Sequence, residues 1–432
     1  MDLIANIQLA ISLSIRLFSR KPILYIFILA FVVRFCFGFF NASNFHTDFT
    51  IIAQNLLQGA GYTLNRINPT AWRTPGYPLI LAGFLALFGK SNLLFTAFKA
   101  SIGAINAVLC ANSGIKIFNR KIGLIAGFLY AIIPYLAKQE VSPEGDGVFI
   151  TLGLLVIFYL LIINKPGQYF IWAALSGLIL AFSYLVRPSI GLIIIFIAFC
   201  VLIDNRSNKK LFLRIACAAI LLTCFLTGIT PWITRNKQEF GKYFFGQSNL
   251  WLNLYLGNNR QTFEIYPYLS LDNLISMQFA YDLPQINRLT EFDREALFRE
   301  KTLREIKLLG IRNICTGAMR KLLYLYQIRM VPYSNRENGN ENIISMTLDK
   351  PRSFTENMAF SIPYTALLMF AVLGCWLERK RTKLLFFAAG ILVSFSLPYL
   401  LTISYSRYTT QVYFIFILFA ARGIEYFLKS KD

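Results

Sequence analysis

Long runs of apolar residues, separated by short polar loops, dominate this chain. A transmembrane helix needs about 20 consecutive residues that are mostly apolar. Candidate runs occupy residues 22–40, 93–117, 121–138, 146–164, 169–186, 188–204, 211–233, 359–377, 383–402 and 408–428. The pattern therefore predicts an all-α polytopic membrane protein, a bundle of about ten transmembrane helices.

Basic residues gather in every second loop and so predict an orientation. Cytoplasmic loops of membrane proteins are enriched in Lys and Arg. With a cytoplasmic N-terminus, the short cytoplasmic segments contain Arg16, Arg20, Lys21, Lys116, Arg120, Lys121, Lys165, Arg206, Lys209, Lys210, Arg214, Arg379, Lys380, Arg381, Lys383, Lys429 and Lys431. The short loops on the opposite side contain few basic residues. We therefore expect a multi-pass protein of the cell's inner (plasma) membrane with both termini in the cytoplasm.

Composition narrows the function classes. Hydrophobic residues make up 56% of the chain and charged residues 15%, whereas soluble domains carry about 25% charged residues. A soluble enzyme and a disordered chain are thereby excluded. The net charge of +21 is mainly a signal of topology, and the short cytoplasmic loops offer no folded surface for nucleic acid. The seven cysteines include no CxxC pair, and the single histidine, His46, excludes a His-rich metal centre and a Ser-His-Asp triad.

One apolar stretch, residues 75–89, is too short to span and is bracketed by Pro and Gly. If it spanned, every later basic loop would move to the outer side. We interpret it as a helix that lies in the outer interface or is only partly inserted. Two segments are then expected outside the membrane, residues 41–92 and about 234–358.

The second outer segment contains a helical pattern over residues 293–329. Its apolar positions are spaced for one face of a helix. These positions are Leu297, Leu303, Ile306, Leu309 and Ile314. Two interpretations are equally good: a helix packed on the protein and a helix that lies on the membrane surface.

The first outer segment predicts a short helix. Thr47 or Asp48 can cap its N-terminus, and Gly59 with Gly61 can end it. Asp48 therefore lies at the start of a helix just beyond the first span, either as a simple cap or as a catalytic acid. Arg73 follows in the sequence RTPGYP, either as an interface arginine or as a phosphate contact.

Other ionisable residues fall at the outer ends of the predicted spans. The carboxylates are Asp48, Glu140, Glu144 and Asp146, and the cations are Arg73, Lys138, Arg187, Arg235 and Arg407. Arg34 lies in the outer half of the first span, where an arginine either serves function or pairs with an acid. Each of these residues also has an interpretation without a functional role. Glu144, beside Pro143, can cap the fourth span, and the arginines can lie at the interface with their charged ends in water.

The order of several short motifs resembles a known family. Asp48, a helix that ends in GAGY (59–62), RTPGYPLILAGFLALFG (73–89), VSPEGDGVF (141–149), YLVRP (184–188), PWITRNKQEFG (231–241), NLYLGNN (253–259) and SRY (406–408) carry the resemblance. It is to the GT-C superfamily of polyprenyl-phosphate-sugar glycosyltransferases. The chain is most similar to the RgtA/B/C/D-like branch, which is related to protein O-mannosyltransferases and the lipid A aminoarabinose transferase.

The resemblance implies an enzyme, a hexosyl- or pentosyltransferase. It would move a sugar from a polyprenyl-phosphate donor to an extracytoplasmic acceptor (an envelope glycan, lipid or protein), with inversion. Asp48 is implied as the general base, and Glu144 as a second catalytic carboxylate that positions the acceptor, shares the work of the base or helps to bind an ion. Donor-phosphate contacts are expected from Arg73, Arg187, Arg235 and Arg407, and further substrate contacts from His46, Asp146, Arg34 and Lys138.

The sequence identifies no cofactor. Carboxylates suit Mg²⁺ or Mn²⁺, so the use of a divalent cation is left as an open alternative. Phe49 stands where some relatives have a second acid, which weakens a two-carboxylate metal site. We expect residues 1–234 to form an N-terminal transmembrane catalytic module, residues 235–358 an extracytoplasmic segment, and residues 359–432 the C-terminal transmembrane helices.

Two rival functions remain: a lipid or sugar transporter or flippase, and a non-catalytic subunit for envelope assembly. Transporters tend to have repeated halves and ionisable residues near the middle of the membrane. Here no repeat is visible, and polar residues collect at the outer ends of the spans. The sequence therefore favours the glycosyltransferase.

Overall fold

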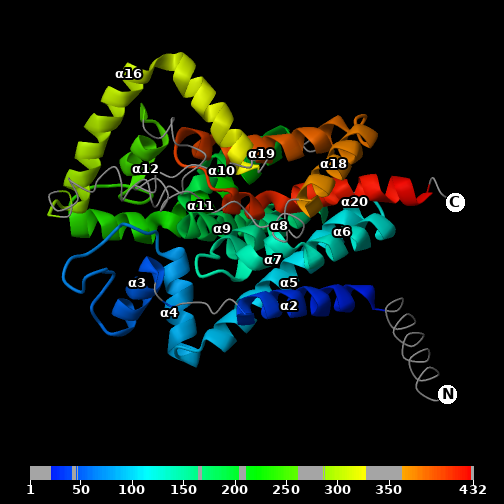
Figure 1. Ribbon diagram of the computed structural model, residues 1–432, viewed down its shortest axis with the longest axis horizontal. Coiled ribbons are helices and arrows are strands. Elements are labelled where there is room, and N and C mark those ends of the chain that lie inside the picture. The colour runs from blue at the N-terminus through cyan, green and yellow to red at the C-terminus, as the bar shows by residue number, and fades with distance from the viewer. Residues whose placement is uncertain are drawn as a thin grey trace, which may run out of the picture.

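The computed structural model describes residues 21–40, 45, 47–163, 168–203, 211–260, 286, 288–326 and 362–429. Over these residues the chain forms a bundle of α-helices (Figure 1), and the only β pairing is an isolated bridge between Thr63 and Pro69. His46 lies outside the described residues. The prediction of an all-α polytopic membrane protein is confirmed.

A helix occupies each of the ten predicted spans. The bounds are α2 (Pro22–Phe40), α5 (Asn92–Ile117), α6 (Arg120–Ile132), α7 (Pro134–Val141), α8 (Gly147–Ile163), α9 (Tyr169–Val186), η1 (Pro188–Ile190), α10 (Gly191–Ile203), α11 (Leu211–Phe240), α18 (Ile362–Leu377), α19 (Thr382–Leu401), η4 (Ser406–Val412) and α20 (Tyr413–Lys429). In the described part of the chain, six helices are long and apolar enough to cross a membrane, and α6 with α7 forms one bent pair. The count of ten spans stays a prediction.

The span predicted over residues 121–138 is not one straight helix. It breaks into α6 and α7, which are bent by 58°. Pro134 is the cause, because proline disfavours helical backbone in the residue before it, and Ile133 is extended at φ −61° and ψ 111°. The turn of residues 142–146 follows α7 directly.

Small residues bring α5 close to its neighbours. Where Gly114 of α5 faces Gly123 of α6, a Cβ atom added to Gly114 would lie 2.8 Å from the Cα atom of Gly123. Such close backbone approach is the usual packing device between membrane helices, since lipid provides no hydrophobic drive for their association. Gly374 and Gly423 play the same part between α18 and α20.

Two short helices belong to the first outer segment: α3 (Asp48–Leu57) and α4 (Gly76–Phe88). With 13 residues, α4 is about 20 Å long, too short for a bilayer core of about 30 Å. It runs across the direction of α2 in Figure 1. This arrangement supports the interpretation of residues 75–89 as an interfacial helix.

The second outer segment contributes α12 (Leu250–Gly257) and α16 (Glu291–Leu325). Helix α16 is bent at Gly310, whose φ of 71° is favourable only for glycine. Of the positions predicted to share one apolar face, Leu303 is 52% exposed and Leu309 is 9% exposed, so the two positions have different surroundings. The buried residues Phe298 and Thr302 pack on α12: the Phe298 ring contacts that of Tyr255, and Thr302 donates a hydrogen bond to the carbonyl oxygen of Trp251.

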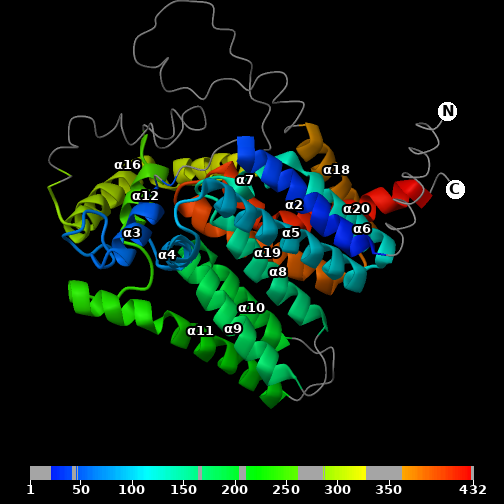
Figure 2. The same ribbon diagram turned by 90° about the horizontal axis from the view of Figure 1, so that it is seen from below.

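The bundle has two distinct ends. The start of α2 and the end of α20 lie together at one end, and α3, α4 and α12 lie at the other in both views (Figures 1 and 2). We call the second the site end. Helix α11 continues to Phe240, past the predicted boundary between residues 234 and 235, and the division into three parts stays a prediction.

Candidate active site

Three carboxylate–guanidinium pairs unite residues that the sequence analysis singled out. Arg73 Nη2 lies 3.1 Å from Asp48 Oδ2, Arg187 Nη2 lies 2.7 Å from Asp146 Oδ1, and Arg407 Nη2 lies 2.8 Å from Glu144 Oε2. The six residues come from four separate parts of the chain. The fold therefore brings acids and cations from distant positions in the sequence into contact.

Asp48 is the first residue of α3, and Thr47 is its N-cap, accepting a hydrogen bond from the Thr50 amide. A carboxylate in the first turn is stabilised by the helix dipole. Its Oδ2 atom accepts hydrogen bonds from Arg73 and from Trp72 Nε1, at 3.1 and 3.2 Å. The Asp48 side chain is 40% exposed and that of Arg73 is 32% exposed. Both charges are therefore accessible to a ligand.

The segment that carries Trp72 and Arg73 is held by Glu291 at the start of α16. Its carboxylate accepts hydrogen bonds from Thr70 Oγ1, from the Ala71 amide and from Ser248 Oγ. Arg294, one turn later, lies over the Trp72 ring at 5.8 Å. Sequence reasoning missed Glu291, because only the fold brings residues 70 and 291 together.

Arg235 has a different environment from the other predicted phosphate ligands. Its guanidinium donates to the carbonyl oxygens of Thr70 and Tyr62 and lies over the rings of Tyr62 and Trp232. The Tyr62 hydroxyl donates to the carbonyl oxygen of Arg73, and burial raises the pKa of Tyr62. The geometry therefore shows Arg235 supporting the first outer segment.

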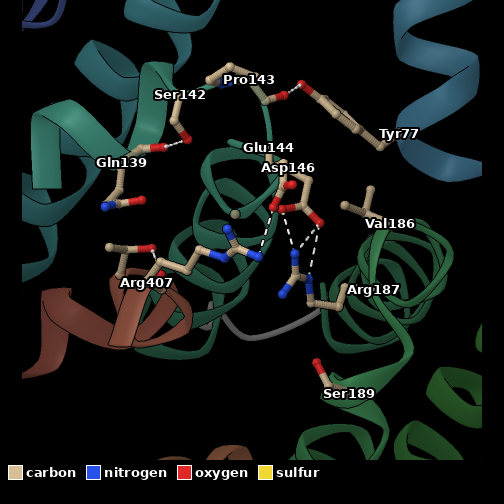
Figure 3. Close-up of polar contacts among 12 residues, drawn as sticks. Tyr77, Gln139, Ser142, Pro143, Glu144, Asp146, Val186, Arg187, Ser189 and Arg407 are labelled. Atoms are coloured by element: carbon tan, nitrogen blue, oxygen red, sulfur yellow. Dashed lines mark hydrogen bonds and ion pairs between the residues drawn. The ribbon is translucent and has the colours of Figure 1, made fainter. Parts of the chain in front are cut away.

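The second pair joins the turn before α8 to the end of α9 (Figure 3). Asp146 is 3% exposed and accepts hydrogen bonds from Nε and Nη2 of Arg187, so the pair is bidentate. Arg187 caps the C-terminus of α9, where positive charge is favourable, and lies 4.5 Å from the centre of the Tyr408 ring. Burial and two-point geometry make this pair rigid.

The third pair lies beside the second, with Arg407 and Arg187 reaching toward one turn that carries both acids (Figure 3). Glu144 is 46% exposed and Arg407 is 34% exposed. Arg407 lies over the rings of Tyr405 and Tyr408, so that Tyr408 contacts both arginines. Two cations therefore share one aromatic surface.

Short contacts connect the first pair to the other two. Thr74 Oγ1 donates to the carbonyl oxygen of Val186, the residue before Arg187. A Cβ atom added to Gly76 would lie 2.5 Å from the amide nitrogen of Val186. The Tyr77 hydroxyl donates to the carbonyl oxygen of Pro143, one residue before Glu144. The RTPGYP segment thus packs directly against both of the other pairs.

Arg34 is fully buried and pairs with Glu140. Its guanidinium also donates to the carbonyl oxygens of Ala30, Ala131 and Tyr130. Of the two roles predicted for Arg34, the geometry matches pairing with an outer acid. Lys138, the remaining predicted contact, lies exposed on α7.

Carboxylates are ligands that divalent cations such as Mg²⁺ prefer in proteins. Within the described ranges, no group of three or more His, Cys, Asp or Glu is arranged to hold a metal ion. Both carboxylate oxygens of Asp146 accept hydrogen bonds from Arg187. Use of a divalent cation stays a prediction.

Comparisons with known proteins agree with this architecture. Residues 72–232 match the family model described as dolichyl-phosphate-mannose-protein mannosyltransferase. The oligosaccharyltransferase of Archaeoglobus fulgidus in its apo form matches with a TM-score of 0.53 and 13% sequence identity, over 96% of this chain and 51% of that protein. The chain has the GT-C fold. The predicted resemblance is confirmed at this level, and the RgtA/B/C/D-like branch stays a prediction.

A second solved GT-C structure extends the comparison. It is the oligosaccharyltransferase AglB of Archaeoglobus fulgidus in complex with an inhibitory peptide and a dolichol-phosphate, with a TM-score of 0.52, 11% identity, and 96% and 51% of the two chains covered. Our chain thus spans about half the length of these two proteins. No curated protein matches it by sequence.

Proposed function

We propose that this chain is a membrane glycosyltransferase that moves a sugar from a polyprenyl-phosphate donor to an extracytoplasmic acceptor. The observation that carries the proposal is the gathering of the three pairs around the RTPGYP segment. The family model over residues 72–232 and the dolichol-phosphate in one GT-C structure support this donor class. We assign the site end to the extracytoplasmic face, because the positive-inside rule assigns the loops rich in Lys and Arg to the cytoplasm.

Asp48 is the proposed general base. As the acceptor hydroxyl or amine attacks the anomeric carbon, its proton passes to the carboxylate, and the bond between that carbon and the phosphate oxygen breaks. Positioned bases of this kind contribute about 10²–10⁴-fold to rate. Direct displacement with inversion is the mechanism that the family resemblance implies, because it needs only one base. Glu144 is the second carboxylate accessible to the acceptor.

Arg73, Arg187 and Arg407 are the proposed contacts for the donor phosphate. The leaving lipid phosphate gains negative charge as the bond breaks, and fixed cations stabilise that charge. Planar guanidinium groups match phosphate oxygens. We assign Arg235 to the support of the first outer segment, since its donors already meet two carbonyl oxygens.

The proposal is tested by transfer of radiolabelled sugar from polyprenyl phosphate, with purified protein in nanodiscs. Mannosyl, glucosyl and pentosyl donors are compared, with an envelope extract from cells that lack the protein as acceptor. We expect Asp48→Asn to lower the rate of transfer about 10²–10⁴-fold. Asp293→Asn is the matched control, because this exposed acid also lies in the first turn of a helix but outside the three pairs.

Each failure has a distinct meaning. Full turnover by a folded Asp48→Asn protein would exclude Asp48 as the base. If no donor supports transfer but proteoliposomes move the lipid across the bilayer, the flippase function replaces the enzyme. Mass spectrometry of envelope glycans from a deletion strain identifies the acceptor when transfer is found.

A further inference from the structure

The second half of α16 exposes an apolar stripe. Positions four residues apart lie on one face of a helix. On this face the exposed fractions are 76% at Ile311, 57% at Met319 and 40% at Leu323, and Cys315 between them is exposed as well. The opposite face packs on the protein through the buried residues Gly317, Lys321 and Leu325. This half of α16 thus buries one face and leaves a continuous apolar face uncovered.

Two hydrogen bonds fix the depth of this helix relative to the membrane. Lys321 Nζ donates to the carbonyl oxygen of Thr402, which caps the C-terminus of α19, at 3.1 Å. The hydroxyl of Tyr326, the residue after α16, lies 2.7 Å from Ser396 Oγ within α19. Because α19 is a candidate span, the last turns of α16 lie at the level where a spanning helix ends.

Helix α19, which α16 contacts, has an exposed apolar face of its own. Val393, Leu397 and Leu401 are spaced by four residues and are 64%, 42% and 54% exposed. On a spanning helix such a face contacts acyl chains. In Figure 1 the second half of α16 meets α19 and extends from it to the bend, at the side of the bundle. The two helices therefore meet where α19 ends.

The charges beside the stripe have a single sign. From Gly310 to Leu325 the sequence contains no carboxylate. The exposed charged residues in this part of the helix are Arg312 and Arg320. Guanidinium groups bind phosphate, and amphipathic helices with basic residues bind at membrane interfaces. An acidic protein partner would meet the arginines but leave the apolar stripe without a matching surface.

We propose that the second half of α16 is an interfacial helix. Its apolar stripe (Ile311, Cys315, Met319 and Leu323) enters the leaflet at the site end, and Arg312 and Arg320 lie at the level of the lipid phosphates. The bend at Gly310 turns the chain from this helix toward Glu291 at the candidate site. The membrane surface is thereby linked to the segment that carries Trp72 and Arg73. The proposal is independent of the proposed enzymatic function.

The test is spin-label accessibility in nanodiscs. A nitroxide is attached at Met319→Cys, and separately at Glu300→Cys, in protein whose native cysteines are replaced by serine. Glu300 is an exposed residue in the first half of the same helix and serves as the matched control. We expect the label at 319 to collide more with oxygen than with a water-soluble nickel complex, and the label at 300 to show the reverse.

Two outcomes would overturn the proposal. Equal collision of nickel with both labels would put position 319 in water, and exclusion of both relaxants at 319 would mean that protein covers the stripe. The arginine contacts are tested by adding Arg312→Gln and Arg320→Gln. In phosphatidylglycerol nanodiscs the double variant should lose immersion of the label at 319, with little change in phosphatidylcholine. The same immersion in both lipids for both proteins would exclude a phosphate contact.

Discussion

Two ion pairs in this protein share their chemistry and differ in their surroundings. Asp48 and Arg73 are 40% and 32% exposed at the site end, whereas Glu140 and Arg34 are 1% and 0% exposed within the bundle. Exposed pairs contribute about 0–1 kcal/mol to stability. Breaking a buried pair costs about 3–5 kcal/mol, since a charge is left without compensation. The exposed pair can therefore exchange a partner for a substrate at little cost to folding.

The largest expected effect is on the buried pair. Glu140→Gln leaves Arg34 buried without a counter-charge and should lower the free energy of unfolding by about 3–5 kcal/mol. Asp48→Asn should lower it by less than about 1 kcal/mol. Denaturant unfolding of both variants in the same detergent gives the comparison. Equal losses would show that exposure does not separate the two pairs.

The next effect separates Arg407 from Arg187. Arg407→Gln should reduce sugar transfer about 10²–10³-fold, the usual cost of losing one group that stabilises developing charge. Its stability should change little, because the partner Glu144 is 46% exposed. Arg187→Gln should reduce both transfer and stability, because Asp146 is 3% exposed. The measurements are the transfer rate and the unfolding midpoint of each variant. Equal changes in stability for the two variants would contradict the prediction.

A smaller effect is expected at Glu291, which positions the exposed pair without touching substrate. Glu291→Gln weakens the hydrogen bonds to Thr70, Ala71 and Ser248. We expect kcat to fall about tenfold, equivalent to about 1.4 kcal/mol, with KM nearly unchanged. Asp293→Asn on the same turn is the control. A rise in KM alone would instead indicate direct contact with substrate.

The last effect is one of pH on stability and concerns Lys321, a buried amine without a carboxylate partner among the described residues. Its amine contacts Asn258 Oδ1 and the Thr402 carbonyl oxygen. Burial lowers the pKa of Lys321 to about 7. Since the unfolded chain holds the proton up to a pKa of about 10.4, folding releases it between these values, and stability should rise with pH by at most about 1.4 kcal/mol per unit.

Lys321→Met removes this titration. Unfolding free energies from pH 7 to 9 should rise more steeply in the parent protein than in the variant. The difference between the two slopes isolates Lys321, because all other groups are shared. Parallel slopes would show that Lys321 keeps its proton in the folded protein.

The apolar runs predicted most of the bundle, because burial in lipid dictates their length and composition. The break at Pro134 was missed, although proline marks it, since the run on both sides is apolar. The different exposure of Leu303 and Leu309 on α16 was not predicted, because it depends on packing against α12 and on the bend at Gly310. Spacing along a helix does not reveal which neighbour that helix will meet.

The residues of the candidate site were predicted individually, and their pairing was not. Motif order pointed to Asp48, Arg73, Glu144, Arg187 and Arg407. Arg187 pairs with Asp146, and Arg407 pairs with Glu144. These pairings depend on how α9 and η4 approach the turn that carries both acids. Glu291 carried no signal beyond an acid at a helix start. Contacts between residues so distant in sequence exist only in the folded chain.

The absence of a side chain at residue 76 limits how this protein can be recombined with its relatives. Backbone atoms of residues 185 and 186 occupy the position of a Cβ atom there. The first outer segment and the end of α9 therefore fit as a matched set. A chimera that transplants residues 73–78 from another GT-C protein must bring the residues around Val186 as well. A chimera that changes only one side of the contact between Gly76 and Val186 would displace both Arg73 and Arg187.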